Sequence, residues 1–265
     1  AGALWHRDQH GRETALWPAL ATASPSAPGP PRVRVSHLAI TPDLALALVD
    51  NNPLAPLEGH PDKSGSALDL GGRPVARWIA ALREALELLA RHMPELLAEL
   101  EVGLQQVVPV GYDEERHLSA SYQEAIGSVY LSLHPRALTM VEALIHEFSH
   151  NKLAALLEQG PLLANAFWPL YPSPVRPDPR PLHGVLLAVH AFLPVARLYE
   201  RMLADREPQS PASGDPQGLR ARLAAIVAGN REGAAVLRAH ARPTSLGAPL
   251  LAEIDRWDRH YEGHG

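Results

Sequence analysis

Two histidines and a glutamate in one short segment are the residues of this chain best suited to chemistry. His146, Glu147 and His150 follow the pattern HExxH. On a helix the two histidines share a face, because residues four apart are neighbours. Two neutral imidazoles on adjacent turns can bind one divalent ion such as iron or zinc, with the glutamate beside it. The spacing therefore predicts a metal site, and with it an enzyme.

A buried helix must carry this motif. We expect it to begin after His134 and Pro135, because a proline in the first turn has no N–H to leave unpaired. Gly160 and Pro161 mark its end. A half-buried strand over residues 128–133, with alternating apolar and polar side chains, comes just before it. The apolar residues that indicate burial of the helix are Leu138, Met140, Val141, Ala143, Leu144 and Ile145.

The rest of the chain predicts an α+β fold that is mostly α-helical. Residues 1–32 are rich in proline and 51–72 in turn formers, so both are expected to be irregular. We expect one catalytic domain, with a loop-rich N-terminal extension over 1–75, a metal-binding core over 76–205 and C-terminal helices over 206–265. Strands are expected at 33–40 and 105–110, and helices at 75–100 with a break near Pro94, 181–204, 218–228, 233–240 and 246–260.

The overall composition limits the functions that are plausible. The chain has 265 residues, 46% of them hydrophobic, and a formal net charge of -5. This balance gives no reason to expect nucleic acid or an anionic membrane as a partner. No uninterrupted apolar run is long enough for a membrane span, so a cytoplasmic location is expected. Without cysteine, disulfides, thiolate ligands and cysteine nucleophiles are excluded, and a metal must use nitrogen and oxygen ligands.

Two ligands do not define a metal site, so a third is needed. The metzincin arrangement is excluded, because Leu153 and Leu156 occupy the positions where it needs glycine and histidine. A gluzincin takes a glutamate from a helix farther along the chain. Between Glu158 and Glu200 there is no glutamate, and Asp178 is the only acid.

The next long helix offers histidines instead. His183 and His190 share a face but lie about 10 Å apart along the axis, too far to bind the same ion easily. We favour His190, because an unpaired imidazole is costly to bury in mid-helix, and keep His183 as the alternative third ligand. The competing interpretation of His190 is a core histidine hydrogen-bonded to a backbone carbonyl.

Three segments carry a resemblance to a known family. They are 173–186 (SPVRPDPRPLHGVL), 127–132 (GSVYLS) and 144–153 (LIHEFSHNKL). They resemble the HExxH-motif proteins encoded beside ribosomally made peptide natural products, some of which are fused to radical-SAM maturases. The resemblance covers roughly residues 119–205, and the first 75 residues match nothing. It implies a zincin-like core with a small sheet against the HExxH helix, and iron(II) and 2-oxoglutarate-dependent peptide β-hydroxylation.

Such a hydroxylase needs three protein ligands on one face of an iron octahedron, with the other positions open to 2-oxoglutarate and O2. His146, His150 and His190 would supply that face. An arginine can bind the distal carboxylate of 2-oxoglutarate through two parallel hydrogen bonds. The candidates are Arg176, Arg180 and Arg197, with Arg180 favoured by the resemblance, although each of the three can equally be a surface arginine.

Three functions remain open. In the hydroxylase, Glu147 orients a ligand, a water or the substrate, a precursor peptide whose leader would lie on residues 51–72 or the C-terminal helices. In a zinc metallopeptidase, Glu147 is instead the general base that takes a proton from metal-bound water. The third possibility is a peptide-binding module without activity.

Overall fold

The structure is a computed structural model, and it describes residues 36–52, 68–173, 178–205 and 215–262. It also describes the backbone of four short strands in two hairpins, β1 (Trp5–Arg7) with β2 (Glu13–Ala15) and β5 (Gly59–His60) with β6 (Lys63–Ser64). Most of the two segments expected to be irregular, 1–32 and 51–72, therefore lies outside the described residues.

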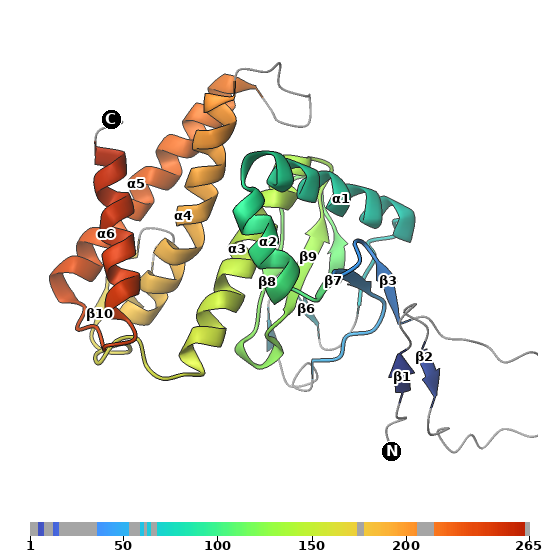
Figure 1. Ribbon diagram of the computed structural model, residues 1–265, viewed down its shortest axis with the longest axis horizontal. Coiled ribbons are helices and arrows are strands. Elements are labelled where there is room, and N and C mark those ends of the chain that lie inside the picture. Colours follow the sequence, from blue (N-terminus) through green and yellow to red (C-terminus); the bar gives the residue numbers. More distant parts are fainter. Residues whose placement is uncertain are drawn as a thin grey trace, which may run out of the picture.

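A five-stranded mixed sheet forms one layer of the fold (Figure 1). Its order is β3-β4-β7-β9-β8, in which β4, β7 and β9 are parallel and the outer strands β3 and β8 are antiparallel to their neighbours. Residues 37–47, from the segment expected to be a loop-rich extension, supply two of these strands. The strands are β3 (His37–Ala39), β4 (Ala45–Ala47), β7 (Gln106–Tyr112), β8 (Ser119–Ala120) and β9 (Ser128–Leu133).

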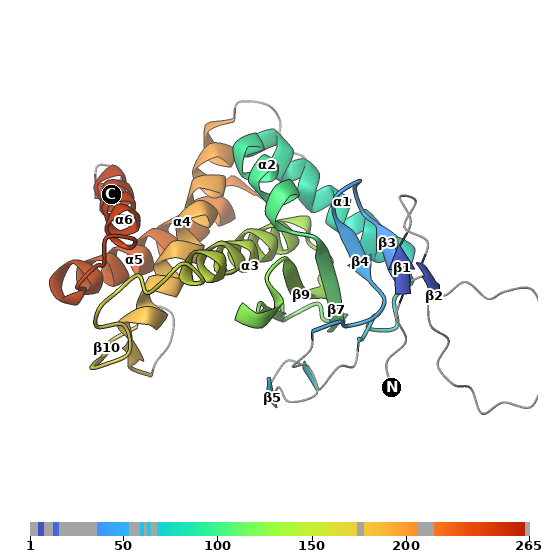
Figure 2. The same cartoon turned by 60° about the horizontal axis from the view of Figure 1, so that its bottom comes forward.

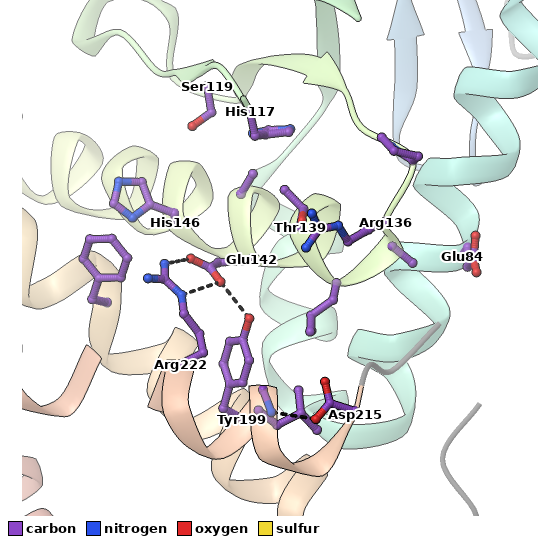
Figure 3. Close-up of a pocket in the computed structure, with 17 residues that line it drawn as sticks. Glu84, His117, Ser119, Arg136, Thr139, Glu142, His146, Tyr199, Asp215 and Arg222 are labelled. Atoms are coloured by element: carbon purple, nitrogen blue, oxygen red, sulfur yellow. Dashed lines mark hydrogen bonds and ion pairs between the residues drawn. The ribbon is translucent and has the colours of Figure 1, made fainter. Parts of the chain in front are cut away.

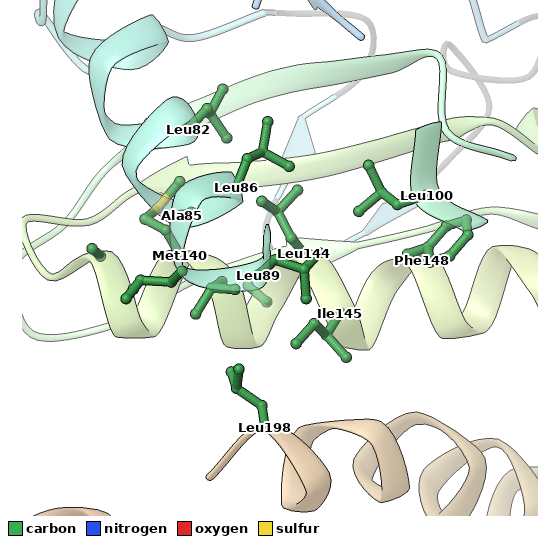
Figure 4. Packing of buried hydrophobic residues seen from close by; sticks show 14 of the residues in the cluster. Leu82, Ala85, Leu86, Leu89, Leu100, Met140, Leu144, Ile145, Phe148 and Leu198 are labelled. Carbon is green, nitrogen blue, oxygen red and sulfur yellow. The ribbon is translucent and has the colours of Figure 1, made fainter. Parts of the chain in front are cut away.

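Three helices cover one face of the sheet (Figure 2). They are α1 (Val75–His92), α2 (Pro94–Gly103) and α3 (Ala137–Leu157), and α3 carries the HExxH motif. The expected break occurs at Met93, before Pro94. Figure 4 shows the apolar core that α1, α2 and α3 share with α4. Its labelled members are Leu82, Ala85, Leu86, Leu89, Leu100, Met140, Leu144, Ile145, Phe148 and Leu198.

Three more helices pack on the side of α3 that faces away from the sheet (Figure 1). They are α4 (Leu182–Ala204), α5 (Pro216–His240) and α6 (Ala248–Glu262). The small hairpin of β10 (Leu170–Tyr171) and β11 (Arg180–Pro181) leads into α4. A second apolar cluster joins α4, α5 and α6 to the end of α3. The motif helix is thus held between a sheet and a helical layer.

Several expectations about secondary structure were wrong. The segments 1–32 and 51–72, expected to be irregular, contain the hairpins β1–β2 and β5–β6. Strand β9 is buried on both faces rather than half-buried, because it lies inside the sheet under α3. Residues 218–240 form part of one helix, not two, since α5 continues through Gly233, which is buried. Tertiary packing around that glycine outweighs its weak helix propensity. The coarse class, α+β and mostly helical, is confirmed.

Helix α4 is the one helix of the described residues that is long and apolar enough to cross a membrane by length and composition alone. However, 61% of its apolar window is buried inside the molecule. Core helices have this composition too, and α4 packs against α3 and α5. Its hydrophobicity is thus accounted for by the core.

Candidate metal centre

Helix α3 leaves one stripe of polar side chains only partly buried. Glu142, His146 and His150 occupy successive turns on the same face of the helix. The residues around them are buried against the sheet and α1. Glu147 points to another side and is almost completely buried, with 3% of its surface exposed. The motif therefore presents both histidines along one line on the helix.

The two motif histidines meet through the nitrogens that would bind a metal. His146 Nε2 and His150 Nε2 lie 3.0 Å apart, with their rings nearly perpendicular at 89°. Burial lowers the pKa of His146 to about 4 and that of His150 to about 3. Both imidazoles are therefore neutral at pH 7, which is the state that a metal ligand needs.

Two serines hold the carboxylate of Glu147. Ser119 Oγ donates to Oε1 at 2.6 Å and Ser121 Oγ donates to Oε2 at 2.7 Å. Ser119 belongs to the outer strand β8, so the glutamate ties α3 to the edge of the sheet. Burial raises the pKa of Glu147, while the two hydroxyl donors act in the opposite direction. The carboxyl is consequently fixed in place and more easily protonated than an exposed one.

The backbone next to Glu147 is anchored as well. Asn151 Nδ2 donates to the carbonyl of Ser128 and to that of Glu147, both at 3.1 Å, and its Oδ1 accepts from Gly127 N at 2.6 Å. Because this buried amide links α3 to the start of β9, the motif cannot shift along the sheet without breaking the two hydrogen bonds to Gly127 and Ser128.

The two candidate third ligands have different environments. His183 lines the same cavity as His146, Glu147 and His150. His190 lies deeper, where burial and the nearby Lys152 lower its pKa to about 4. Its Nδ1 is buried without a hydrogen-bond partner among the described residues. Among the described residues, no backbone carbonyl accepts a hydrogen bond from His190 Nδ1.

Three histidines here share an uncommon property. Within the described ranges, the Nδ1 atoms of His146, His150 and His190 are all buried and unpaired. Buried ring nitrogens normally have a partner, either in the protein or in bound water or an ion. The same described residues contain no three His, Asp or Glu side chains that already surround one point. The motif histidines face each other through Nε2, so an ion bound there leaves their Nδ1 atoms unpaired, and those atoms are not evidence for it. As neutral imidazoles His146 and His150 are suitable ligands, and the third ligand would have to turn towards the ion.

Two cavities meet at His146. The motif cavity, of about 350 Å³, is lined by Ser119, Ser121, His146, Glu147, His150 and His183 among others. The arginine cavity, of about 680 Å³, is lined by His117, Glu142, His146, Phe192, Tyr199 and Arg222 among others. His146 is thus accessible from both, whereas Glu147 faces only the first.

The arginine cavity contains a cluster that the sequence did not indicate (Figure 3). Glu142 accepts hydrogen bonds from Tyr199 Oη at 2.8 Å and from Arg222 Nε at 3.2 Å, and Arg222 Nη2 also donates to it. Glu142 lies one turn before His146, so the helical spacing could have placed it beside the motif. Nothing local could have found Arg222, because it comes from α5.

The three arginines that the sequence proposed have other surroundings. Arg180 pairs with Asp178, Nε to Oδ2 at 3.1 Å. Arg197 binds Glu95 at 3.2 Å and lies over the ring of Trp257, on the side of α4 towards α2 and α6. Neither of these lines the motif cavity or the arginine cavity. Arg176 lies outside the described residues.

Comparison of the chain with protein-family models and with curated proteins finds no match. The resemblance to HExxH peptide-modifying proteins therefore stays a prediction that rests on the residues quoted for it, as does the zincin-like character of the core.

Proposed function

We propose that this protein is an iron(II) and 2-oxoglutarate-dependent enzyme that hydroxylates the β-carbon of a side chain in a ribosomally made precursor peptide. His146 and His150 are the first two iron ligands, and His190 is the third. When bound, the iron and the oxo acid supply the power to oxidise an unactivated C–H bond with O2. The protein binds and orients the reactants and keeps water away from them.

The pairing of the two motif nitrogens is the observation that carries this proposal, because it places two neutral imidazoles within reach of one divalent ion. For metal–nitrogen bonds of about 2.1 Å, two ligands at 90° lie about 3.0 Å apart, and two at the tetrahedral angle about 3.4 Å apart. His146 Nε2 and His150 Nε2 are 3.0 Å apart. The two nitrogens are hydrogen-bonded to each other at this distance, so both can turn towards one divalent ion, and the distance itself does not distinguish an octahedral iron site from a tetrahedral zinc site.

The surroundings of Glu147 support a positioning role. Both of its carboxylate oxygens already accept a hydrogen bond from a serine of the β8 region. Strand β8 is also the last strand of the sheet, with no further strand beside it among the described residues. An extended peptide can add to such an edge through backbone hydrogen bonds. Through its hydrogen bonds with Ser119 and Ser121, Glu147 then keeps the edge strand β8 next to the two histidines.

A zinc metallopeptidase is the second candidate, and one observation favours it. Glu147 lies in the motif cavity with both histidines, and burial raises its pKa. A carboxylate whose pKa lies closer to neutrality is a better general base for the water that attacks a peptide bond. In that case the same motif serves hydrolysis, and a zinc ion replaces iron.

One assay separates these functions. The protein is loaded anaerobically with iron(II) and then mixed with O2, 2-oxoglutarate and a candidate precursor peptide. Gain of one oxygen atom by the peptide, together with formation of succinate, supports the hydroxylase. Cleavage of the peptide by the zinc-loaded protein supports the peptidase, and unchanged peptide under both conditions argues against both enzymes.

The variant Glu147→Gln sharpens the result. A peptidase that loses its general base should lose about 100-fold to 10,000-fold in rate. A hydroxylase in which Glu147 positions β8 keeps much more, because glutamine still accepts a hydrogen bond through its amide oxygen. Glu158→Gln is the matched control, since Glu158 is an exposed glutamate just beyond the end of α3.

A further inference from the structure

The arginine cavity is larger than the motif cavity that it meets at His146, and the function of its cluster is not explained by the fold alone. We propose that Arg222 binds the carboxylate of a ligand that lies in this cavity. The inference rests on the proposed function, under which the ligand is 2-oxoglutarate or an acidic side chain of the peptide. It replaces Arg180 with Arg222 as the carboxylate partner.

Arg222 has donors to spare. A guanidinium carries five N–H donors in a plane. Glu142 takes one from Nε and one from Nη2, and Tyr199 is also within hydrogen-bonding reach of the guanidinium, so at least two of the five donors remain. These remaining donors can bind a second carboxylate through two parallel hydrogen bonds. The side chain is 44% exposed, so a ligand can reach it.

The cluster holds this arginine in one orientation. Glu142 comes from α3, Tyr199 from α4 and Arg222 from α5, so three helices fix the guanidinium (Figure 3). The hydrogen bonds that Arg222 donates to Glu142 raise the pKa of Arg222 further above its usual value. Arg222 is therefore always charged, and a ligand does not have to order its side chain first.

Arg222 also lies close to the motif, with the ring of Phe192 between it and His146. Its guanidinium carbon is 6.0 Å from the ring centre of Phe192, and that ring centre is 4.7 Å from the ring centre of His146. The charge on Arg222 is close enough to lower the pKa of His146, although burial lowers it more. A small ligand can thus contact His146 at one end and Arg222 at the other, along the face of Phe192.

The positions of the hydrogen-bonding groups in the arginine cavity must select the ligand more than the net charge of the cavity does. Glu142 offsets the positive charge of Arg222, and His117 across the cavity is neutral at pH 7 because burial lowers its pKa to about 4. His117 Nε2 is buried without a partner among the described residues, and the ring lines the cavity. Its other ring nitrogen is hydrogen-bonded to the backbone of Ser132, so the neutral ring carries its proton there and Nε2 accepts from a ligand rather than donating to it. A planar carboxylate therefore finds its donors on Arg222, and a hydroxyl or N–H group of the ligand can face His117.

The test measures binding separately from turnover. Calorimetric titrations are done anaerobically with iron(II) present, using two pairs of probes. One pair is 2-oxoglutarate and 2-oxobutanoate, which lacks the distal carboxylate. The other is the capped amino acids N-acetylaspartate amide and N-acetylasparagine amide. Wild type is compared with Arg222→Gln, and Arg220→Gln, an exposed arginine on the same helix, is the matched control.

We expect wild type to bind at least one carboxylate probe more tightly than its uncharged partner, and Arg222→Gln to lose that preference by at least about tenfold in affinity. The probe that shows the effect identifies the source of the carboxylate. Arg222→Gln alone leaves the carboxylate of Glu142 without its cationic partner. The double variant Glu142→Gln with Arg222→Gln replaces both charges by neutral hydrogen-bonding groups, so it tests the loss of carboxylate preference without that unpaired charge.

Equal binding of both members of each pair by wild type overturns the proposal, and so does an unchanged preference in either variant. A failure of the proposed function is seen separately, as the absence of hydroxylated peptide with the wild-type enzyme. The two failures are thus distinguishable.

Discussion

The two cavities that meet at His146 differ in how their polar groups are satisfied. In the arginine cavity, Glu142, Tyr199 and Arg222 bind one another across three helices. Around the motif cavity, His146 and His150 keep buried Nδ1 atoms without partners among the described residues, and so does the deeper His190. Among the described residues, the carboxylate of Glu142 in the arginine cavity is fully paired, although Arg222 keeps donors for a ligand and His117 Nε2 has no partner, whereas the motif histidines have no polar partner besides each other. Under the proposed function, the histidines are the metal-binding side of the site and the Glu142 cluster holds Arg222 in place beside them.

The largest expected effect comes from removing a motif histidine. His150→Ala should lower iron(II) affinity by more than about 100-fold, since loss of a ligand exceeds the 10-fold to 100-fold cost of losing an outer partner. Metal content after anaerobic loading and desalting measures it. His240→Ala is the control, because His240 is an exposed histidine stacked on Tyr171.

The same measurement decides between the candidate third ligands. His190→Ala should reduce iron(II) binding by a similar factor, and His183→Ala by less than about tenfold. Equal metal content in wild type and His190→Ala would show that the unpaired ring is not a ligand. The contrast between the two cavities would then depend on His146 and His150 alone.

A smaller expected effect is on the stability of the protein at acid pH, and it comes from His117 in the arginine cavity. Burial first, and then the neighbouring His134, lower the pKa of His117 to about 4, whereas its value in the unfolded chain is near 6.5. Below pH 6.5 the unfolded state therefore binds a proton that the folded state does not, and stability falls as the pH drops towards 4. Between pH 7 and pH 5 this histidine should cost roughly 2 kcal/mol.

Urea unfolding of wild type and His117→Leu at both pH values measures that cost. The loss of unfolding free energy on acidification should be smaller in the variant. If the two proteins lose the same amount, His117 is already protonated in the fold, and the arginine cavity is more polar than its geometry indicates.

The smallest expected effect is on the stability that the Glu142–Tyr199–Arg222 cluster contributes. Tyr199→Phe removes one hydrogen bond to Glu142, which should cost about 1 kcal/mol of unfolding free energy. Iron(II) binding should not change, because Arg222 still satisfies both carboxylate oxygens. Thermal unfolding together with metal analysis checks both statements. A loss of bound iron would show that the Glu142 cluster and the metal-binding histidines are coupled, and not independent.

The sequence predicted the helices well because each has a strong local signal. The apolar spacing of α1, the proline at Pro94 and the proline before α4 all act within a few residues. Strand β9 was found at its true bounds, but its burial on both faces depends on α3 and on neighbouring strands. The continuity of α5 through Gly233 was missed for the same reason, since packing by α4 and α6 is not visible in the local pattern.

The sequence by itself determined the pairing of His146 and His150, because HExxH spacing on a helix brings two imidazoles together through backbone geometry alone. Only the tertiary structure decided what surrounds it. The serines that hold Glu147 come from β8, and the arginine beside His146 comes from α5, more than a full helix farther along the chain. Contacts between distant segments depend on how whole elements pack, and no short-range spacing records that.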